Sequence, residues 1–294
     1  MTYVGRFAPS PSGPLHLGSV VAAAASYLDA KAHHGVWLVR IEDLDQGRSD
    51  PAIAQHILDT LAALGMKPDR PPTYQSRQQH RYRDAAAALR GQGLIYPCGC
   101  TRAQIREAAQ TPGVYPGTCR DGLAQGRSGR SLRLRLEQPG DAFDDRFAGP
   151  QYSQSGQDYG DPTIVRADNS FAYILAGAVD DVLDGITDVV RGDDLLPTTS
   201  PQRLLLERLG LTPPRYAHIP VLLGPDGRKL SKQNHAPAID ASEPLAVLRH
   251  ALDALGLRPF LGRETFPQSV NGLWRAAICA WKDYLADRQA TISR

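Results

Sequence analysis

Residues 6–19 read RFAPSPSGPLHLGS, and this stretch decides how the chain folds. It follows the short apolar run 3–5 and precedes the alanine-rich run 20–25, an order that predicts a strand, a rigid loop and the start of a helix. The prolines fix φ and remove backbone donors, whereas Gly13 and Gly18 allow a ligand to approach the backbone closely. Because a helix N-terminus has unpaired N–H groups and a positive dipole end, the stretch favours a phosphate.

A second stretch far down the chain, residues 224–232 with the sequence GPDGRKLSK, is a tight turn followed by Lys229 and Lys232. Two cations on a glycine-rich loop suit a polyphosphate whose negative charge grows as a leaving group departs. His16 and Ser19 add side-chain donors at the first stretch. Taken alone, that first stretch is also compatible with a proline-rich turn that carries a chance histidine.

Composition bounds the class of protein. The chain has 294 residues, of which 42% are hydrophobic, enough for one large or two ordinary domains with a real core. No apolar run approaches the length of a membrane span and no charged-then-apolar leader follows Met1, so we expect a soluble, cytoplasmic protein. No long coiled-coil pattern argues for an obligate partner, and we expect a monomer.

The formal net charge of +2 does not by itself require nucleic acid, so any RNA contact must come from a local patch. Residues 120–135 supply one with Arg120, Arg127, Arg130, Arg133 and Arg135. A solvated, charged loop explains these arginines equally well. The alternation of residues 131–136 predicts a half-buried strand with its arginines outward.

Polar residues follow the apolar run 36–41, which reads as a buried strand. Ligands of an open parallel sheet bind beyond the carboxyl ends of its strands, so Glu42, Asp43 and Asp45 should face the site. Glu42 is our candidate for a substrate ammonium, whereas a helix N-cap role explains Asp45 better.

The same rule directs Arg191 and Asp194 into the pocket, from the end of a strand over 186–194. A guanidinium fork matches a carboxylate, although Arg191 could instead pair with Asp193 or Asp194. Further strands are expected at 163–166, 171–176 and 218–223, and helices at about 20–32, 53–64, 77–89, 177–184, 201–209, 245–248 and 273–285.

Three cysteines lie close together in the sequence, at Cys98, Cys100 and Cys119, and no histidine occurs between His80 and His218. A zinc site here would have three thiolates and an oxygen or water as its fourth ligand. The spacing is only a partial zinc signature, so three incidental thiols remain the alternative.

The sequences HLGS at 16–19 and KLSKQ at 229–233 resemble HIGH and KMSKS, the two signature motifs of class I aminoacyl-tRNA synthetases. Leu230 replaces the usual methionine, an isosteric change that we expect to be harmless. Residues 6–13, 40–45 and 191–196 resemble the glutamyl/glutaminyl branch, and within it the short paralogues that attach glutamate to queuosine. The resemblance runs from residue 2 to about 260.

This resemblance implies an α/β fold with a Rossmann-like parallel sheet. Residues 1–95 and 162–235 would form its two halves, split by a small zinc-containing insert at 96–161 and followed by a helical extension at 236–294. In the family the insert grips the RNA, and a tyrosine that matches Tyr115 completes a structural zinc site with Cys98, Cys100 and Cys119. Asp121 and water are the alternative fourth ligands.

The resemblance also implies tRNA-independent activation of L-glutamate by ATP with Mg²⁺, followed by transfer to queuosine at the wobble position of tRNA(Asp). It assigns catalysis to His16, Lys229, Ser231 and Lys232, and ATP binding to His16, Gly18, Ser19 and Lys232. It assigns glutamate binding to Arg6, Phe7, Ala8, Pro9, Ser10, Glu42, Tyr173 and Arg191. The alternatives are a truncated synthetase that charges a tRNA 3′ end, a non-catalytic RNA-binding paralogue and a nucleotidyltransferase for a small acid.

Overall fold

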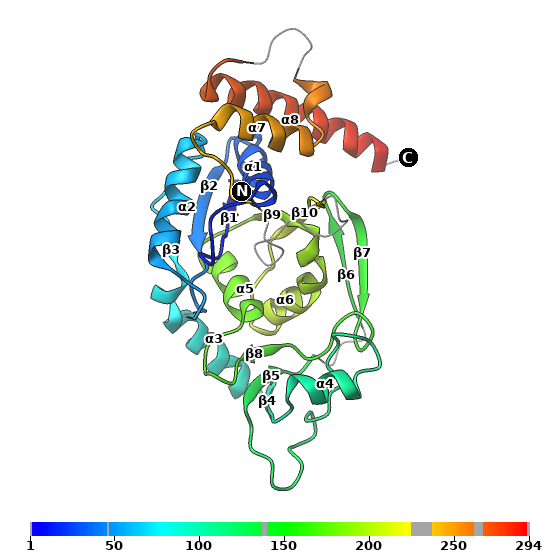
Figure 1. Cartoon of the computed structure of the whole chain (residues 1–294). Helices are drawn as coiled ribbons and strands as arrows, with labels where there is room; N and C mark the ends of the chain where they lie inside the picture. Colours follow the sequence, from blue (N-terminus) through cyan, green and yellow to red (C-terminus); the bar gives the residue numbers. More distant parts are fainter. Residues whose placement is uncertain (1, 46, 137–139, 225–236, 262–266, 293–294) are drawn as a thin grey trace.

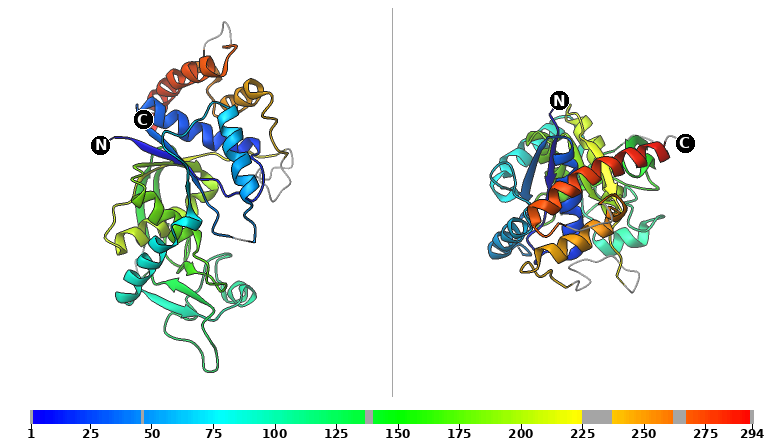
Figure 2. Two further views of the ribbon diagram at one scale, coloured as in Figure 1. Left: turned by 90° about the vertical axis from the view of Figure 1, so that its left-hand side faces the viewer. Right: turned by 90° about the horizontal axis from the view of Figure 1, so that it is seen from above.

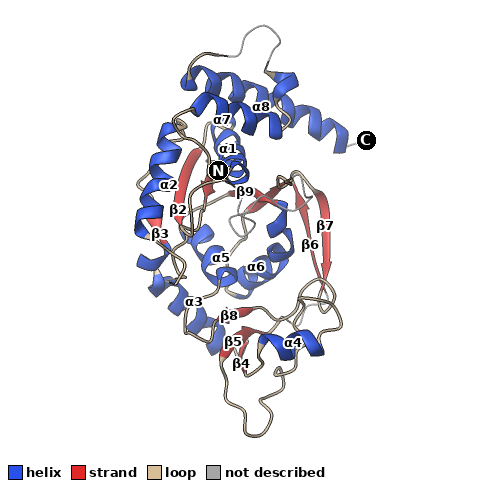
Figure 3. Ribbon diagram, viewed as in Figure 1, coloured by secondary structure: helices blue, strands red, loops and turns tan. Residues whose placement is uncertain are grey.

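The computed structural model describes residues 2–45, 47–136, 140–224, 237–261 and 267–292. The molecule is elongated, with its C-terminal helices at one end and the segment around β4, β5 and α4 at the other (Figures 1 and 2). The helices are α1 (Leu17–Ala32), α2 (Pro51–Ala63), α3 (Gln79–Gly91), α4 (Arg102–Ala108), α5 (Tyr173–Leu183), α6 (Leu196–Arg208), α7 (Pro244–Ala254) and α8 (Val270–Ile292) (Figure 3). The strands are β1 (Val4–Phe7), β2 (Val36–Ile41), β3 (Thr73–Tyr74), β4 (Ile95–Cys98), β5 (Ser131–Leu134), β6 (Gly140–Asp145), β7 (Gly149–Gln154), β8 (Thr163–Val165), β9 (Asp188–Gly192) and β10 (Arg215–Ile219).

The first half of the chain forms a parallel sheet in the order β1-β2-β3, as its strand and helix signals predict. β1 pairs with β2 from Val4↔Val36 to Phe7↔Val39. Helix α1 crosses from β1 to β2 and buries an alanine-rich face, in which Ala23, Ala24 and Ala25 are fully covered. Short side chains let the helix lie close to the strands, and the loop 8–16 is therefore held between two buried elements.

The second parallel pair, β9 and β10, lies beside β1. Their ladder runs from Asp188↔Arg215 to Gly192↔Ile219, and the N–H of Thr187 donates to the carbonyl of Val4 at 2.9 Å. The predicted single sheet is thus present as two hydrogen-bonded parts that meet at β1 and β9. The parallel α/β architecture itself is confirmed.

The central segment contributes to two different sheets. β5 pairs antiparallel with both β4 and β8 at the far end of the molecule. The antiparallel hairpin β6–β7 reaches back instead, and β6 pairs with β10 at Asp145↔Tyr216 (Figure 1). Strand pairing therefore crosses the boundary we expected at 161/162. The domain limits stay a prediction.

The C-terminal helices α7 and α8 pack on α1 and close the core at that end. The indole N–H of Trp274 donates to the carbonyl of Leu64 at 2.8 Å, and that of Trp281 donates to Asp29 at 3.1 Å. None of the helices in the described parts of the chain is long and apolar enough to cross a membrane.

The expected strand at 171–176 is wrong. Helix α5 begins at Tyr173 and buries every residue from Leu175 to Asp181. In a continuous apolar run, the spacing of hydrophobic residues does not distinguish a buried strand from a fully buried helix. As a result, Tyr173 stands at the start of a helix and not on a strand. β10 also begins and ends earlier than expected, at Arg215 and Ile219.

Candidate active site

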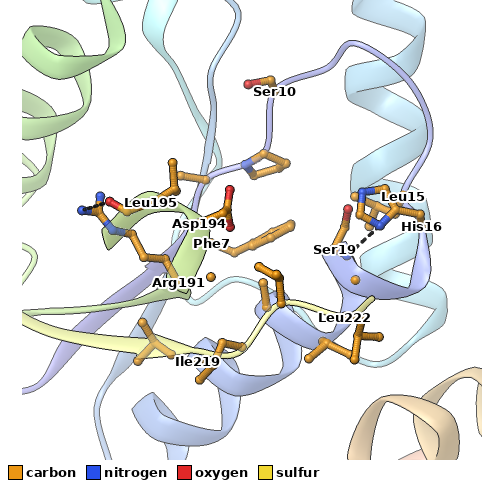
Figure 4. A pocket seen from close by; sticks show the side chains of 18 of the residues that line it. Phe7, Ser10, Leu15, His16, Ser19, Arg191, Asp194, Leu195, Ile219 and Leu222 are labelled. Atoms are coloured by element: carbon orange, nitrogen blue, oxygen red, sulfur yellow. Dashed lines mark hydrogen bonds between the residues drawn. The ribbon is translucent and has the colours of Figure 1, made fainter. Parts of the chain in front are cut away.

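A cavity of about 330 Å³ lies between the two parallel pairs, at the carboxyl ends of β1, β9 and β10 (Figure 4). This is where ligands bind in open parallel sheets. Most of the residues predicted for the site line this one cavity: Arg6, Phe7, Ala8, Pro9, Ser10, His16, Gly18, Ser19, Tyr173 and Arg191. Residues that are far apart in the sequence thus meet, and the cavity is the candidate active site.

His16 forms the start of α1. Its Nδ1 accepts a hydrogen bond from the N–H of Ser19 at 3.2 Å, so the imidazole acts as the N-cap of the helix (Figure 4). The ring is 9% exposed. It is therefore fixed at the positive end of the α1 dipole, where a phosphate group is stabilised by the helix N–H groups.

Arg6 lies on the wall of the cavity and is itself held from behind. Its Nε and Nη2 donate to the two carboxylate oxygens of Asp181 at 2.9 and 3.2 Å. Burial acts to lower the pKa of Arg6, but the charge of Asp181, its hydrogen bond and the nearby Tyr173 together raise the pKa, so the guanidinium stays charged. The carboxylate of Asp181 also lies 2.8 Å from the Nη2 of Arg40. One carboxylate thus pairs with two arginines.

Among the described residues that we predicted to bind glutamate or ATP, Glu42 is the one that does not line the cavity. Its carboxylate lies 3.4 Å from the Nη2 of Arg40 and its side chain is 10% exposed. Burial raises the pKa of Glu42 to about 7, against the opposing effect of Arg40 and Arg6. A carboxyl group with this pKa changes charge near neutral pH.

Arg191 is 5% exposed and is held by acceptors from β10, α6, α5 and the turn that precedes α6. Three hydrogen bonds are short: Nε to His218 at 3.0 Å, Nη1 to Gln202 at 2.9 Å and Nη2 to Thr199 at 2.7 Å. Two contacts are longer, from Nη1 to the hydroxyl of Tyr173 at 3.2 Å and from Nη2 to the carbonyl of Leu195 at 3.4 Å.

Each terminal nitrogen of Arg191 therefore has one short and one long contact. The partners of the long contacts, Tyr173 and Leu195, both line the cavity. A bidentate carboxylate can replace both long contacts while the three short ones keep the guanidinium in place.

The lysine loop cannot be placed against the cavity, because Lys229, Ser231 and Lys232 lie outside the described residues. β10, which precedes this loop, ends at Ile219, and Ile219 to Leu222 line the cavity. The chain thus leaves the described range close to the candidate site.

The three cysteines come together at the far end of the molecule. The Sγ atoms of Cys98, Cys100 and Cys119 all lie within 4.8 Å of one another. The hydroxyl of Tyr115 lies 3.4 Å from the Sγ of Cys98 and accepts a hydrogen bond from the N–H of Cys119 at 2.9 Å.

This donor set fits a tetrahedral zinc ion, since Zn–S bonds of about 2.3 Å separate the sulfurs by roughly 3.8 Å. Burial acts to raise the pKa of the Cys98 thiol, but its hydrogen bonds with Tyr115 and with the N–H of Cys100, together with Arg133, lower the pKa to about 7. Tyr115 lies beside the thiols, whereas Asp121 is exposed and lies near Arg135.

The expectation that the arginines of 131–136 point outward is wrong for Arg133. Arg133 is 8% exposed. Its guanidinium carbon lies 3.6 Å from the centre of the Tyr115 ring, and its Nη1 donates to the carbonyl of Asp161 at 2.7 Å. Arg120 also pairs with Asp161, at 2.7 Å. Of the arginines in the basic stretch, Arg127 and Arg130 are the exposed ones.

Sequence reasoning missed the residues that hold the cavity arginines. Asp181, Asp145 and His218 are fully or almost fully buried and lie behind Arg6 and Arg191. A charged residue inside an apolar run, as at Asp180-Asp181, was the available signal, because such residues are buried only when they are paired.

Comparisons with known proteins agree with the geometry. The family described as "tRNA synthetases class I (E and Q), catalytic domain" matches residues 3–258. A glutamyl-Q tRNA(Asp) synthetase from Bordetella bronchiseptica is 49% identical over 284 residues, which cover 93% of this chain and 89% of the relative. Another from Burkholderia cenocepacia strain HI2424 is 50% identical over 288 residues, which cover 95% and 96%.

Among solved structures, a glutamate tRNA ligase from Elizabethkingia meningosepticum in complex with its amino acid has a TM-score of 0.69 and 28% identity. The similarity covers 79% of this chain and 52% of the ligase, so this chain spans about half the length of that enzyme. The chain belongs to the class I tRNA synthetases of the E and Q group, in the family of the glutamyl-Q tRNA(Asp) synthetases.

Proposed function

We propose that this protein activates L-glutamate with ATP and transfers the glutamyl group to queuosine at the wobble position of tRNA(Asp). The observation that carries the proposal is the cavity in which a helix N-terminus capped by His16 faces two buried arginines, Arg6 and Arg191. A helix N-terminus suits the phosphates of ATP, and paired guanidinium groups suit the two carboxylates of glutamate. The relatives in the family are named for the same reaction.

In the first step a carboxylate oxygen of glutamate attacks the α-phosphorus of ATP. The bond to the bridging oxygen breaks, pyrophosphate leaves with that electron pair, and glutamyl-adenylate forms. In the second step a nucleophilic group of the queuosine base attacks the acyl carbon, the bond from that carbon to the phosphate oxygen breaks, AMP leaves with the electron pair, and the proton of the nucleophile passes to the AMP phosphate. Positioning and charge stabilisation are the main tasks of the protein, because neither step requires a difficult proton abstraction.

The phosphate side of the site consists of His16, Gly18 and Ser19 at the start of α1, together with the lysine loop. We assign His16 to phosphate oxygens, and Lys232, with Lys229 and Ser231, to the charge that develops as pyrophosphate departs. Mg²⁺ accompanies ATP as part of that substrate.

The glutamate side consists of the segment Arg6 to Ser10 and the residues around Arg191. We assign Arg6 and Arg191 to the substrate carboxylates, Tyr173 to a hydrogen bond from the cavity wall, and Glu42 to the ammonium group. Glu42 does not line the cavity, so this last role requires its side chain to move toward the cavity when glutamate binds.

The cysteine cluster supports a structural role for zinc. We assign Cys98, Cys100, Tyr115 and Cys119 as its ligands, which leaves no open coordination position for chemistry. Zinc would stabilise the small insert 96–161, whose local cluster around these residues contains few large apolar side chains. We propose this insert as the part that grips the RNA, between the catalytic halves 1–95 and 162–235 and with 236–294 as a helical extension.

The decisive experiment is ATP–pyrophosphate exchange with glutamate, glutamine and aspartate in the absence of tRNA, followed by transfer of labelled glutamate to tRNA(Asp). Exchange with glutamate alone, and transfer only to tRNA that contains queuosine, are the expected results. Loss of transfer on removing the 3′-terminal adenosine, or exchange that requires tRNA(Glu), would instead identify a truncated enzyme that charges tRNA 3′ ends.

A further inference from the structure

A buried chain of polar groups connects the β6–β7 hairpin to the glutamate side of the cavity. Asp145, at the end of β6, lies 2.6 Å from the Nδ1 of His218, and the Nε2 of His218 lies 3.0 Å from the Nε of Arg191. The side chains of Asp145 and His218 are completely buried. These polar groups thus connect the cavity residue Arg191 to β6, a strand that does not itself line the cavity.

The protonation state of His218 follows from the groups beside its two ring nitrogens. The Nε of Arg191 and the hydroxyl of Thr199 lie 3.0 and 3.1 Å from Nε2, and Asp145 lies at Nδ1; a hydroxyl can donate or accept, so the arginine decides. The Nε of arginine can only donate, so the Nε2 of His218 must accept and the ring proton must sit on Nδ1. The Nδ1–H of His218 therefore donates to the Oδ2 of Asp145. Burial lowers the pKa of His218, in part against the hydrogen bond to Asp145, which agrees with a neutral ring.

Asp145 cannot easily rotate. Its Oδ1 accepts three backbone N–H groups, from Phe147 at 2.9 Å, Ala148 at 2.8 Å and His218 at 3.0 Å. The other oxygen is therefore fixed against the imidazole. Hydrogen bonds to a carboxylate are among the stronger ones in proteins, so the aspartate selects one tautomer of His218.

We infer that Asp145 and His218 are positioning residues for glutamate recognition, which fix the guanidinium of Arg191 by presenting an obligatory acceptor to its Nε. This inference rests on the proposed role of Arg191 as a glutamate ligand. The Nε contact fixes the plane of the guanidinium, and with it the positions of the terminal nitrogens, whose long contacts go to the cavity-lining residues Tyr173 and Leu195.

The nearly isosteric variant Asp145→Asn tests the inference sharply. The three backbone N–H groups hold the amide oxygen at the position of Oδ1, which places the amide NH₂ against the Nδ1 of His218. The ring must then accept on Nδ1 and carry its proton on Nε2, opposite the Nε–H of Arg191. Two donors would face each other, and the Nε of Arg191 would lose its acceptor, while the bonds to Gln202 and Thr199 would remain.

We expect Asp145→Asn to raise the KM for glutamate roughly 10- to 100-fold in ATP–pyrophosphate exchange, the effect of losing one hydrogen bond to a charged group. The KM for ATP should change less than about threefold, because the phosphate side of the site is built from other residues. Equal increases in both constants, or an unchanged KM for glutamate, would overturn the inference.

A second pair of variants separates positioning from general damage to the fold. The amide oxygen of His218→Gln can occupy the position of Nε2 and accept from Arg191 without any tautomer, whereas His218→Asn is too short to do so. We expect the Gln variant to keep a lower KM for glutamate than the Asn variant. Introducing Asp145→Asn into the Gln background should raise KM less than it does in the parent protein. Equal effects in both backgrounds would overturn the inference.

The ¹⁵N resonances of the imidazole give a readout that does not depend on activity. The resonance absent from His218→Gln identifies His218, and its Nε2 should show the shift of an unprotonated nitrogen in the parent and of a protonated one in Asp145→Asn. Arg191→Ala tests the role of Arg191 separately from the roles of Asp145 and His218. If it leaves the KM for glutamate unchanged, the proposed role of Arg191 fails, and the inference fails with it. If it raises that KM and Asp145→Asn does not, the inference alone fails.

Discussion

Asp181 accepts two hydrogen bonds from Arg6, at 2.9 Å from Nε and 3.2 Å from Nη2, while the Nη2 of Arg40 lies 2.8 Å from the same carboxylate. All three side chains are at least 95% covered. Helix α5 thus supplies the counter-charge that keeps a guanidinium of β1 on the cavity wall. Both guanidinium groups remain charged because this carboxylate is ionised, and its pKa is lowered by Arg6 and Arg40 against the effect of burial.

Asp181→Asn should therefore destabilise the fold. It leaves two buried guanidinium groups without their shared counter-charge, and breaking a buried ion pair on one side costs about 3–5 kcal/mol. Chemical denaturation gives the free energy of unfolding. The matched control is Asp84→Asn, the same change on an exposed position of α3, which should lie within about 0.5 kcal/mol of the parent. A loss below about 1 kcal/mol for Asp181→Asn would contradict this account of the pair.

The raised pKa of Glu42 predicts a pH-dependent affinity for glutamate. Its carboxyl group is largely protonated below about pH 7 in the free protein, and only the carboxylate can balance the substrate ammonium. The KM for glutamate should fall as pH rises from 6 to 8. Glu42→Gln should have a higher KM that does not depend on pH in this window. A parent enzyme whose KM is flat between these values would rule out Glu42 as the ammonium acceptor.

The same shift affects stability. Because the folded pKa of Glu42 lies above its ordinary value of 4.5, the folded state binds more protons than the unfolded state between about pH 4.5 and 7. This group therefore lowers the free energy of unfolding as pH rises through that window. Glu42→Gln should remove part of the decline, which denaturation at pH 5 and pH 8 will show.

Zinc content tests the cysteine cluster. We expect about one zinc ion per chain, by elemental analysis of protein purified without chelator. Cys119→Ser should lower the content to a small fraction of this, and a strong chelator should lower the melting temperature of the parent. Cys279→Ser is the control, since Cys279 is an exposed free cysteine on α8, away from the cluster. An equal zinc content in both variants would contradict the assignment.

The sequence reveals the position of the cavity because each signal for it is local. The stretch 6–19 combines strand, proline, glycine and helix signals within a few residues, and polar residues at strand ends, such as Arg191, are directed to the site by the rule for parallel sheets. The groups behind the cavity could not be assigned in this way. Asp145 reaches Arg191 only through His218, and that contact depends on a strand pairing between residues far apart in the sequence.

Arg133 shows the corresponding limit for surface patterns. Alternation indicates which side chains share a face of a strand, but it does not indicate whether another segment covers that face. In this protein β5 lies between β4 and β8, and Tyr115 covers the guanidinium of Arg133. The basic stretch thus has two kinds of arginine: internal ones that hold the insert together, and Arg127 and Arg130, which face solvent.

This division predicts how RNA binding will respond to substitution. Arg127→Ala with Arg130→Ala should weaken binding of tRNA(Asp) and leave tRNA-independent ATP–pyrophosphate exchange unchanged. These exposed arginines directly precede β5, which lies at the far end of the molecule from the cavity (Figure 1). If each arginine neutralises one phosphate, the slope of log K against log salt should decrease in magnitude by about 2. Arg275→Ala, an exposed arginine on α8 at the opposite end, is the control and should leave the slope unchanged. A double variant that binds tRNA with the parent slope would show that the insert grips RNA without these arginines.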